Sequence, residues 1–468
     1  MEEKEYDVAI LGAGPGGYPT AIKLAQNGKK VALIEAKDIG GTCLNRGCIP
    51  TKTLIANAEV LHHVKAAHEY GIVAKDVKID FGYMTKQKDE IVHKLQKSLE
   101  GLVRANRIDL FCGFGKFTSP NTLKVIGKDN ALIRANSIVI ATGSEPKEIP
   151  AFAFDGKYIH SSTSILQLER LPKKMAIVGG GVIGCEFASL YAELGVEVSL
   201  IEALDRLLPL ECETLSNFLT KSFQKRGIHL QIGALVSQIQ KNEGGISVLL
   251  KDGKKIDADL ALVAIGRSLN IADIGLEKAG VVTDKGMIPV DECMQTNVAG
   301  IYAIGDITAK AMYAHVATHQ GFVAASHILN EEERLHMDYD AIPGVIFTHP
   351  EIGTVGMNLE QALKRGYSAK RASYPLSALG KAQAAKETEG FAQVVIDTET
   401  GQILGAQIVG ADASSLISCM TYAIANELTI ECITDTIHAH PTLAESWMEA
   451  SFIARGIPLH FPPVVKKS

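Results

Sequence analysis

Residues 6–17 have the sequence YDVAILGAGPGG, and the expected architecture follows from this stretch. Its apolar part, residues 6–11, predicts a short buried strand, and a helix pattern runs from the glycines to about Asn27. A second strand over residues 30–34 ends at Glu35. This order of strand, glycine-rich turn, helix and strand predicts one βαβ unit of an α/β protein.

The glycines Gly12, Gly14 and Gly17 have the spacing G-x-G-x-x-G. Glycines at this spacing permit a tight turn and let the backbone approach a pyrophosphate at the helix N-terminus. Glu35, at the end of the next strand, can accept hydrogen bonds from ribose hydroxyls. A glycine-rich turn without a ligand is the alternative, but the strand, the helix and the acidic residue together favour a dinucleotide site.

The same unit recurs once later in the chain. A strand over residues 174–178 leads into GGGVIG, and the next strand, residues 197–201, ends at Glu202. The spaced glycines of this copy are Gly179, Gly181 and Gly184. Glu202 favours a free ribose 2′-hydroxyl over a 2′-phosphate, and the nearest arginine after it is Arg206. We therefore expect NAD rather than NADP in the second unit, and hydride transfer between two bound dinucleotides as the purpose of the pair.

The composition excludes some classes of function. The chain has 468 residues, of which 46% are hydrophobic, and a formal net charge of −6, so no basic surface suggests nucleic acid as a partner. No apolar run approaches the ~20 residues of a membrane span. The acidic start, residues 1–5, lacks the basic and apolar parts of a signal peptide. We expect no membrane association and a cytoplasmic location.

Eight cysteines are present, but only Cys43 and Cys48 lie close together. Scattered cysteines suit reduced core thiols, so the close pair is the candidate for redox chemistry. On a regular helix, residues five apart are too far for a disulfide, whose Cα atoms lie within ~7 Å. Asn45 and Gly47 tolerate the necessary distortion, and Pro50 suits the first turn of a following helix. A helix N-terminus and a nearby cation would lower the pKa of a thiol there. On spacing alone, a structural pair or two core thiols stay open.

Residues 40–52, GGTCLNRGCIPTK, resemble the redox-disulfide signature of the pyridine nucleotide–disulfide oxidoreductases of the glutathione reductase type. The resemblance extends over essentially the whole chain. It implies that Cys43 exchanges with the substrate, that Cys48 lies beside the flavin of FAD, and that Lys52 lies near the flavin ring.

The resemblance also assigns residues around the two cofactors, FAD and NAD. Glu186 matches the family carboxylate that pairs with the lysine near the flavin, and Asp306 matches the acid that binds the ribityl or phosphate region of FAD. Further cofactor contacts are implied at Thr42, Thr142, Gly143, Gly266, Ala314 and His315. No metal-ligand set is expected.

The repeated unit and the resemblance predict an α/β fold, with two Rossmann-like dinucleotide-binding domains and a C-terminal α+β dimerisation domain. The expected parts are residues 1–148 for the FAD domain with the redox disulfide, 149–270 for the NAD domain, 271–340 for a central segment that completes the FAD site, and 341–468 for the dimerisation domain. In the last part, residues 391–397 and 403–409 predict paired strands, and helices are expected around 414–426 and 443–454.

Near the C-terminus, HAHPTLAE at residues 438–445 places a histidine five residues before a carboxylate. An imidazole with a near-neutral pKa can take a proton from a dithiol and return it. The segment resembles the dihydrolipoamide dehydrogenase branch of the family, which oxidises protein-bound dihydrolipoamide with NAD. This resemblance implies that His440 is the acid–base catalyst and Glu445 its orienting partner, whereas His438 is expected to be structural. It also implies a homodimer in which His440 reaches the disulfide of the other subunit. The implied partners are lipoyl domains and the transacylase core of 2-oxoacid dehydrogenase or glycine-cleavage complexes.

Several alternatives fit the sequence less well than this branch. A glutathione-type reductase would want arginines for the 2′-phosphate of NADPH, and these are absent after the second unit. Mercuric reductase and the large thioredoxin reductases would want a C-terminal cysteine pair, but no cysteine follows Cys432. A scaffold subunit with structural FAD is a non-enzymatic alternative, which the intact redox and acid–base residues disfavour. Arg46 departs from the branch pattern, which is usually apolar there, and its effect on the disulfide is an open question.

Overall fold

The computed structural model describes residues 3–462 and divides into two compact units. Unit 1 contains residues 3–175, 237–249 and 257–337, and unit 2 contains residues 176–236, 250–256 and 338–462. This division follows packing rather than cofactors, so the expected boundaries at 148, 270 and 340 remain predictions. Among the described residues, no helix combines the length and the apolar character that a membrane crossing requires.

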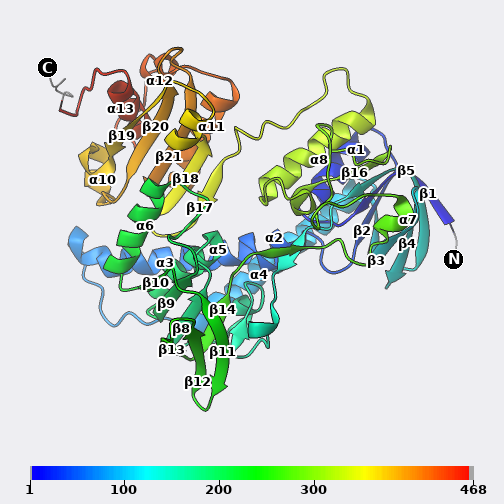
Figure 1. Ribbon diagram of the computed structural model, residues 1–468, viewed down its shortest axis with the longest axis horizontal. Helices are drawn as coiled ribbons and strands as arrows, with labels where there is room; N and C mark the ends of the chain where they lie inside the picture. Colours follow the sequence, from blue (N-terminus) through cyan, green and yellow to red (C-terminus); the bar gives the residue numbers. More distant parts are fainter. Residues whose placement is uncertain (1–2, 463–468) are drawn as a thin grey trace. The chain divides into compact units, whose positions relative to one another are not determined.

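Unit 1 is built on the predicted sheet of parallel strands (Figure 1). β1 (Glu3–Leu11) pairs in parallel with β2 (Val31–Glu35) on one side and with β5 (Ala131–Ile140) on the other. β3 (Asp109–Ser119) and β16 (Ile301–Ala303) extend the sheet in parallel, and β4 (Thr122–Gly127) pairs antiparallel with β3 and β5. The last four residues of β1 are all buried, as expected for a central parallel strand.

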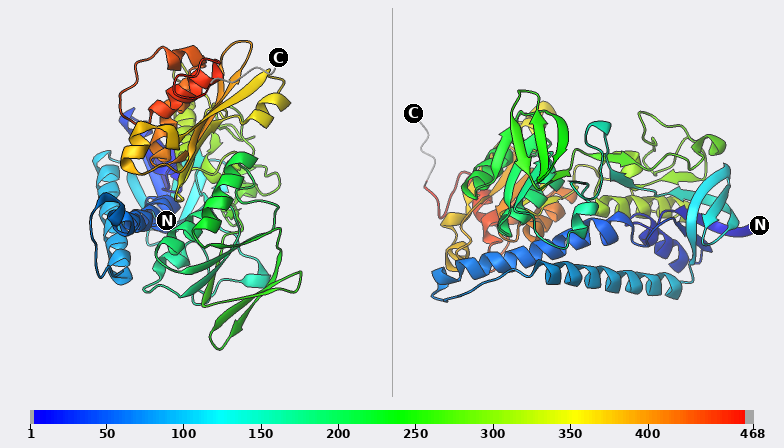
Figure 2. Two further views of the ribbon diagram at one scale, coloured as in Figure 1. Left: turned by 90° about the vertical axis from the view of Figure 1, so that its left-hand side faces the viewer. Right: turned by 90° about the horizontal axis from the view of Figure 1, so that it is seen from below.

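The helices of unit 1 hold the first glycine loop and the cysteines. α1 (Gly17–Gln26) follows β1, and α2 (Gly41–Arg46) and α3 (Cys48–Ala66) follow β2. α4 (Phe81–Ala105) lies alongside α3 as a long antiparallel partner (Figure 2). α8 (Ala314–Leu329) packs so closely on α1 that a Cβ at Gly321 would lie 1.9 Å from Oγ1 of Thr20. Only glycine fits at this helix crossing.

The other elements of unit 1 are short. They are η1 (Ala67–Tyr70), β6 (Ser144–Pro146), η2 (Pro150–Phe152), β7 (Ile159–His160), η3 (Ser164–Gln167), β14 (Leu260–Val263), β15 (Arg267–Leu269), α7 (Leu276–Ala279) and η4 (Gly305–Thr308). β6 pairs antiparallel with β15, and β7 pairs in parallel with β14. Four strands contain residues of both units, namely β8 (Lys174–Val178), β11 (Val236–Asn242), β12 (Gly245–Leu250) and β13 (Lys255–Ala258).

Unit 2 contains the helix and the closing strand of the second predicted βαβ unit. β8 (Lys174–Val178) leads through the glycines into α5 (Val182–Glu193), and β9 (Glu197–Glu202) follows. α6 (Glu213–Lys225) then leads to β10 (His229–Ile232), which pairs with β9 in parallel. The predicted order of strand, turn, helix and strand is confirmed, and Glu202 is the last residue of its strand.

The C-terminal part of unit 2 is the predicted α+β domain (Figure 1). Its sheet has the order β17 (Gly344–Ile346), β18 (Glu351–Gly356), β21 (Ile403–Gly410), β20 (Phe391–Asp397) and β19 (Ala369–Pro375), all antiparallel. α11 (Ala413–Ala425) packs on β18 and β21, and α13 (Glu445–Ala454) packs on β19 and β20. The short elements are α9 (Leu359–Lys364), η5 (Leu376–Ala378), α10 (Gly380–Ala385) and α12 (Ile430–Thr434). Trp447 of α13 is fully buried, and its Nε1 donates to the carbonyl oxygen of Leu416 at 3.1 Å, so α11 and α13 share one core.

Candidate active site and nucleotide-binding loops

The first glycine loop has no room for side chains at two of its three spaced glycines. Gly12 has a φ of +108°, and a Cβ there would lie 2.3 Å from the carbonyl oxygen of Ala141. A Cβ at Gly17 would lie 1.8 Å from the carbonyl oxygen of Gly12. At Gly14, in contrast, the nearest heavy atom to a Cβ is 3.9 Å away, on Gly41. The loop is therefore tight on the protein side and open at Gly14, which fits a backbone that a pyrophosphate approaches.

Glu35 closes this loop from the end of β2. Its Oε2 accepts a hydrogen bond from the backbone N–H of Ala13 at 2.8 Å, and its Oε1 accepts one from the N–H of Lys37 at 2.8 Å. Each carboxylate oxygen can accept a second hydrogen bond. The side chain is thus held in place by the loop and can still receive a ribose hydroxyl.

The second glycine loop repeats this geometry in unit 2. A Cβ at Gly184 would lie 1.8 Å from the carbonyl oxygen of Gly179, whose φ is +111°, and a Cβ at Gly181 would meet nothing within 4 Å. Oε2 of Glu202 accepts the N–H of Gly180 at 2.5 Å. Both loops therefore fit a dinucleotide, since each keeps an open space beside the N-terminus of a helix.

Asp306, predicted to bind FAD, lies in η4 and is held by two residues that the sequence did not single out. It accepts a hydrogen bond from the hydroxyl of Ser144, and Nε of Arg267 lies 3.7 Å from its Oδ2. Arg267 also donates to the hydroxyl and to the carbonyl oxygen of Ser144, both at 2.6 Å. The neighbouring N–H of Gly305 donates to the fully buried Gln320 at 2.7 Å. This network fixes the carboxylate in unit 1.

Thr142, Gly143 and Gly266 lie at strand ends near the same network. The hydroxyl of Thr142 donates to the carbonyl oxygen of Asn270 at 2.7 Å, and the amide of Asn270 donates back to the carbonyl oxygen of Thr142 at 2.9 Å. Gly143 and Gly266 both have positive φ, and a Cβ at either would meet nothing within 4 Å. Open space beside both glycines is compatible with a bound cofactor.

Ala314 and His315 begin α8, next to the first glycine loop. The ring of His315 stacks on Tyr313 with centroids 5.1 Å apart. One turn further, the hydroxyl of Thr318 donates to the carbonyl oxygen of Pro15 at 2.7 Å. This bond ties the start of α8 to the loop that is expected to bind the pyrophosphate.

The two candidate redox cysteines stand on either side of a helix break. Cys43 lies within α2, and Cys48 is the first residue of α3. Gly47 separates the helices, with φ −141° and ψ −104°. A Cβ at Gly47 would lie 3.0 Å from the carbonyl oxygen of Thr42, and Pro50 occupies the first turn of α3 as expected. The distortion that the spacing requires is therefore present, and it is located at Gly47.

Polar side chains stiffen α2 around the cysteines. The side-chain amide of Asn45 donates to the carbonyl oxygens of Ile39 and Gly41, both at 2.9 Å. Nη1 of Arg46 pairs with Oδ2 of Asp38 at 3.0 Å, and the Arg46 side chain is 17% exposed. Its buried Nε atom has no hydrogen-bond partner among the described residues. Arg46 is thus folded onto the start of the loop and does not extend into solvent.

The side chains of Cys43 and Cys48 hydrogen bond each other. The hydrogen bond to Cys48, followed by burial, raises the pKa of the Cys43 thiol far above its ordinary value, and the charge of Lys52 lowers it only in part. The sequence predicts a lowered pKa for a thiol of this pair without naming which one, and the shift of Cys43 is in the opposite direction. Lys52 acts in the expected direction, but the neighbouring sulfur outweighs it. Burial and the nearby Cys43 also raise the pKa of Tyr18 on α1, so this tyrosine, which the sequence did not single out, lies close to the pair.

Glu186 is buried on α5, and its Oε1 accepts the backbone N–H of Phe347 at 3.0 Å. A backbone N–H group thus satisfies part of the hydrogen-bonding capacity of the Glu186 carboxylate. The expected pairing of Glu186 with Lys52 remains a prediction.

The histidine and the glutamate of the C-terminal motif lie together at the start of α13. Nδ1 of His440 hydrogen bonds Oε1 of Glu445 at 2.8 Å, and the N–H of Thr442 donates to Oε2 at 2.8 Å. Although burial raises the pKa of Glu445, the Thr442 N–H and the His440 imidazole lower it below its ordinary value. The imidazole is 76% exposed, whereas the carboxylate is 13% exposed. A partly buried, ionised carboxylate therefore holds an exposed imidazole.

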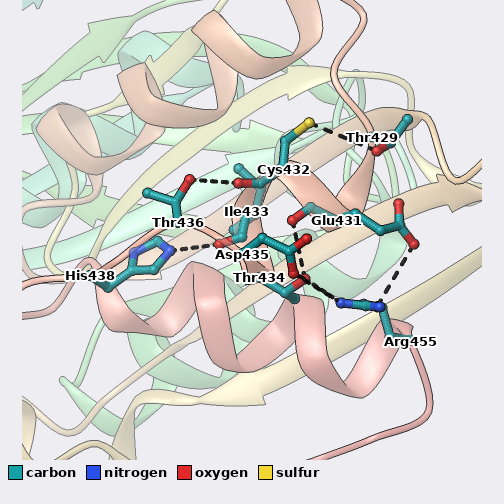
Figure 3. Close-up of polar contacts among 9 residues, drawn as sticks. All are labelled: Thr429, Glu431, Cys432, Ile433, Thr434, Asp435, Thr436, His438 and Arg455. Atoms are coloured by element: carbon teal, nitrogen blue, oxygen red, sulfur yellow. Dashed lines mark hydrogen bonds and ion pairs between the residues drawn. The ribbon is translucent and has the colours of Figure 1, made fainter.

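His438 makes a different contact, which Figure 3 shows. Its Nε2 hydrogen bonds the carbonyl oxygen of Ile433 in α12 at 2.9 Å. Nearby, Nη1 of Arg455 donates to the hydroxyl of Thr434 at 2.6 Å, and its Nε lies 3.7 Å from Glu431 (Figure 3). These bonds tie α12 to the end of α13 and to the loop after α12. The geometry agrees with a structural part for His438.

Comparisons with known proteins cover almost the whole chain. Residues 6–321 match the family model described as pyridine nucleotide-disulphide oxidoreductase, and residues 342–451 match the dimerisation domain of that family. A dihydrolipoyl dehydrogenase of Chlamydia pneumoniae is 50% identical over 461 residues, covering 98% of this chain and 99% of that protein. A dihydrolipoyl dehydrogenase of Bacillus subtilis is 38% identical, covering 97% of this chain and 98% of that protein. The solved structure of LpdA from Mycobacterium tuberculosis aligns with a TM-score of 0.91 at 27% identity, covering 97% of this chain and 100% of that chain.

The match to the dimerisation domain indicates that the protein forms a homodimer. The family model over residues 6–321 spans both glycine loops and the cysteine pair, and family members use FAD together with NAD(H). The relatives are similar over their full length, so the likeness extends beyond the shared nucleotide-binding units. The chain belongs to the pyridine nucleotide-disulphide oxidoreductase family.

Proposed function

We propose that the protein is a dihydrolipoamide dehydrogenase, which oxidises protein-bound dihydrolipoamide to lipoamide and reduces NAD to NADH. The hydrogen bond of 2.8 Å between His440 and Glu445 supplies an acid–base pair for dithiol–disulfide exchange, and Glu202 at the end of β9 favours NAD over NADP. Oxidation of a dithiol releases two thiol protons, so the enzyme needs an acid–base group as well as a redox pair. Relatives named dihydrolipoyl dehydrogenase, up to 50% identical, support the assignment.

The sulfur chemistry can be assigned to Cys43 and Cys48. A substrate thiol transfers its proton to His440, and the resulting thiolate attacks the Cys43 sulfur of the oxidised pair. The S–S bond breaks, Cys48 leaves as a thiolate, and a mixed disulfide forms. The second substrate sulfur then attacks the first, which closes the lipoamide disulfide, while its proton goes to the departing Cys43. The raised pKa of Cys43 beside Cys48 supports an outcome in which Cys43 keeps the proton.

Glu445 would serve the proton transfer without being protonated. Its pKa is below the ordinary value, so it remains a carboxylate at neutral pH and stabilises the imidazolium that forms on His440. Its bond to Nδ1 leaves Nε2 to face the substrate, and among the described residues Nε2 has no hydrogen-bond partner.

The cofactor loops would hold FAD in unit 1 and NAD in unit 2. Backbone N–H groups beside Gly14 and Gly181 would face the pyrophosphates, and Glu35 and Glu202 would accept from the riboses. Asp306 would hold the ribityl or phosphate region of FAD. When bound, FAD supplies the chemistry that moves the electron pair from the dithiol to NAD as a hydride.

The substrate chemistry implies the partners. Lipoyl groups are carried on domains of multienzyme complexes, so we infer a lipoyl domain and a transacylase core of a 2-oxoacid dehydrogenase or glycine-cleavage complex. In the homodimer, His440 would act on the cysteine pair of the other subunit, and Lys52 would pair with Glu186. We also propose a location in the cytoplasm, because only Cys43 and Cys48 of the eight cysteines lie close together in the sequence, and scattered cysteines suit a reducing compartment.

An anaerobic absorbance titration of the purified flavoprotein with dihydrolipoamide, followed by NAD, tests the proposal. We expect a long-wavelength absorbance band when the dithiol forms. After NAD is added, we expect the absorbance of NADH to appear. Rapid reduction by NADPH with glutathione disulfide as acceptor, and none by dihydrolipoamide, would refute the substrate assignment and leave the family unchanged.

A further inference from the structure

Helix α13 contributes the glutamates of two histidine–glutamate pairs, and these glutamates lie one helical turn apart. Glu445 and Glu449 are four residues apart and therefore lie on the same side of the helix. Nδ1 of His440 lies 2.8 Å from Oε1 of Glu445, and Nδ1 of His460 lies 2.8 Å from Oε1 of Glu449. In each pair the imidazole is mostly exposed, at 76% and 72%, while the carboxylate is 13% and 3% exposed. The geometry of the expected acid–base pair thus occurs a second time.

The buried carboxylate of Glu449 has His460 as the partner that compensates its charge. The carboxylate is buried, and its Oε2 atom has no hydrogen-bond partner among the described residues. A buried carboxylate is costly unless a cation or hydrogen-bond donors compensate it. The hydrogen bond to Glu449 and then the charge of Glu449 raise the pKa of His460, and Glu445 adds a smaller effect in the same direction. His460 is therefore protonated over a wider pH range than an isolated histidine.

The other charged and titratable groups on the elements that pack against α13 do not replace His460. Tyr374 of β19 is buried; burial, Glu449 and Glu445 raise its pKa, and its hydroxyl donates to the carbonyl oxygen of Ala378. The remaining groups are engaged elsewhere or lie at exposed positions, namely Arg455 with Glu431 and Asp435, Asp397 with Thr400, His438 with Ile433, and Lys370 and Arg371 of β19.

We propose that His460 is a positioning residue for proton transfer: its side chain compensates the charge of Glu449, so that Glu445 is the carboxylate that acts on His440. This inference rests on the proposed function, in which His440 is the acid–base group. Without the charge of His460, two carboxylates one turn apart would both stabilise the imidazolium of His440, and less of the enzyme would be ready to accept a proton at a given pH.

Two single substitutions and their combination test the charge balance. His460→Asn removes the positive charge but keeps a donor for Oε1, and we expect the acidic limb of the kcat/KM profile for dihydrolipoamide to move up by about half a pH unit. Glu449→Gln removes the negative charge, and we expect a shift of about the same size downward. The double variant should return close to the wild-type profile.

A titration of His440 gives a second readout that needs no substrate. In the full-length flavoprotein with 15N-labelled histidine, the His440 signal is assigned by its loss in His440→Gln and followed over pH. Opposite shifts in the two single variants support the inference. Shifts of the same sign, or none beyond error, overturn it and leave His460 a merely structural anchor. If His460→Asn does not fold, the direction in Glu449→Gln decides.

The two proposals can fail separately. A wild-type enzyme that does not oxidise dihydrolipoamide refutes the proposed function, while the His440 titration still decides whether the second pair acts on the first. A wild-type enzyme that is active, with variants whose pH profiles and titrations do not move, refutes only the part assigned to His460.

Discussion

Alanine substitutions at Gly14 and Gly17 should separate cofactor binding from folding. A Cβ at Gly17 would lie 1.8 Å from the carbonyl oxygen of Gly12, and two backbone segments would have to move apart to admit it. Overpacking of this kind costs about 3 kcal/mol of the free energy of unfolding. A Cβ at Gly14 meets its nearest heavy atom at 3.9 Å, so the flavin-free protein should lose no more than about 0.5 kcal/mol.

Gly14→Ala should lower the affinity for FAD, although it should hardly change the stability of the flavin-free protein. The added methyl would occupy the open side of the loop, where the pyrophosphate is expected to approach the backbone. Loss of one or two hydrogen bonds to a charged group, about 1.5–3 kcal/mol, corresponds to a roughly ten- to hundredfold higher Kd. Urea unfolding of the flavin-free proteins measures the first quantity, and quenching of FAD fluorescence on reconstitution measures the second.

The second loop provides a built-in replicate. A Cβ at Gly184 would lie 1.8 Å from the carbonyl oxygen of Gly179, whereas a Cβ at Gly181 would meet nothing within 4 Å. Gly184→Ala should therefore destabilise the protein, and Gly181→Ala should weaken NAD binding. The reasoning is refuted if Gly14→Ala destabilises the flavin-free protein as much as Gly17→Ala, or if it binds FAD as tightly as the wild type.

Three further substitutions test the redox loop and the acid–base pair. Cys43→Ser should abolish dihydrolipoamide turnover in a steady-state assay and leave the dimer intact in sedimentation; residual turnover would contradict the disulfide mechanism. Glu445→Gln should lower kcat/KM by about a hundredfold. Because the pKa of Glu445 is lowered in the folded state, its contribution to stability is present above the unfolded pKa of about 4.3 and is lost as the pH falls through the folded value. The free energies of unfolding of the wild type and the variant should therefore converge in acid. A difference that widens in acid would contradict this prediction. Arg46→Met should change the free energy of unfolding in urea by no more than about 1 kcal/mol. The ion pair with the half-exposed Asp38 is weak, and the buried Nε of Arg46 has no hydrogen-bond partner among the described residues. A loss above about 2 kcal/mol would show that the ion pair stabilises the fold more than its geometry suggests.

Features whose causes are local could be predicted from the sequence. The glycine loops need only a few adjacent residues, and each acidic residue at a strand end bonds the loop of its own βαβ unit. The helix break at Gly47 follows from the spacing of two cysteines that cannot meet on one helix. The segment around His440 and Glu445 is likewise short, so one turn of chain brings both side chains together.

Contacts between distant segments could not be predicted in the same way. Ser144 meets Asp306 across 162 positions and Arg267 across 123, and neither distance leaves a periodic signal in the sequence. The open question on Arg46 also depended on a partner outside the motif, Asp38, and on the burial of its own Nε. The sequence pointed to the residue as unusual, but only the packing shows that it turns away from solvent.

The raised pKa of Cys43 and the second histidine–glutamate pair beside α13 have one physical cause. A helix N-terminus and a lysine lower the pKa of an isolated thiol, but the sulfur of Cys48 shares the proton and reverses the result. Likewise, Glu445 is the only acidic partner that the motif shows for His440, whereas the fold places Glu449 and His460 one turn away. A motif names the group that titrates, whereas the neighbours that set its pKa lie wherever the fold brings them. Residues that tune a proton transfer are therefore harder to find in a sequence than residues that carry it out.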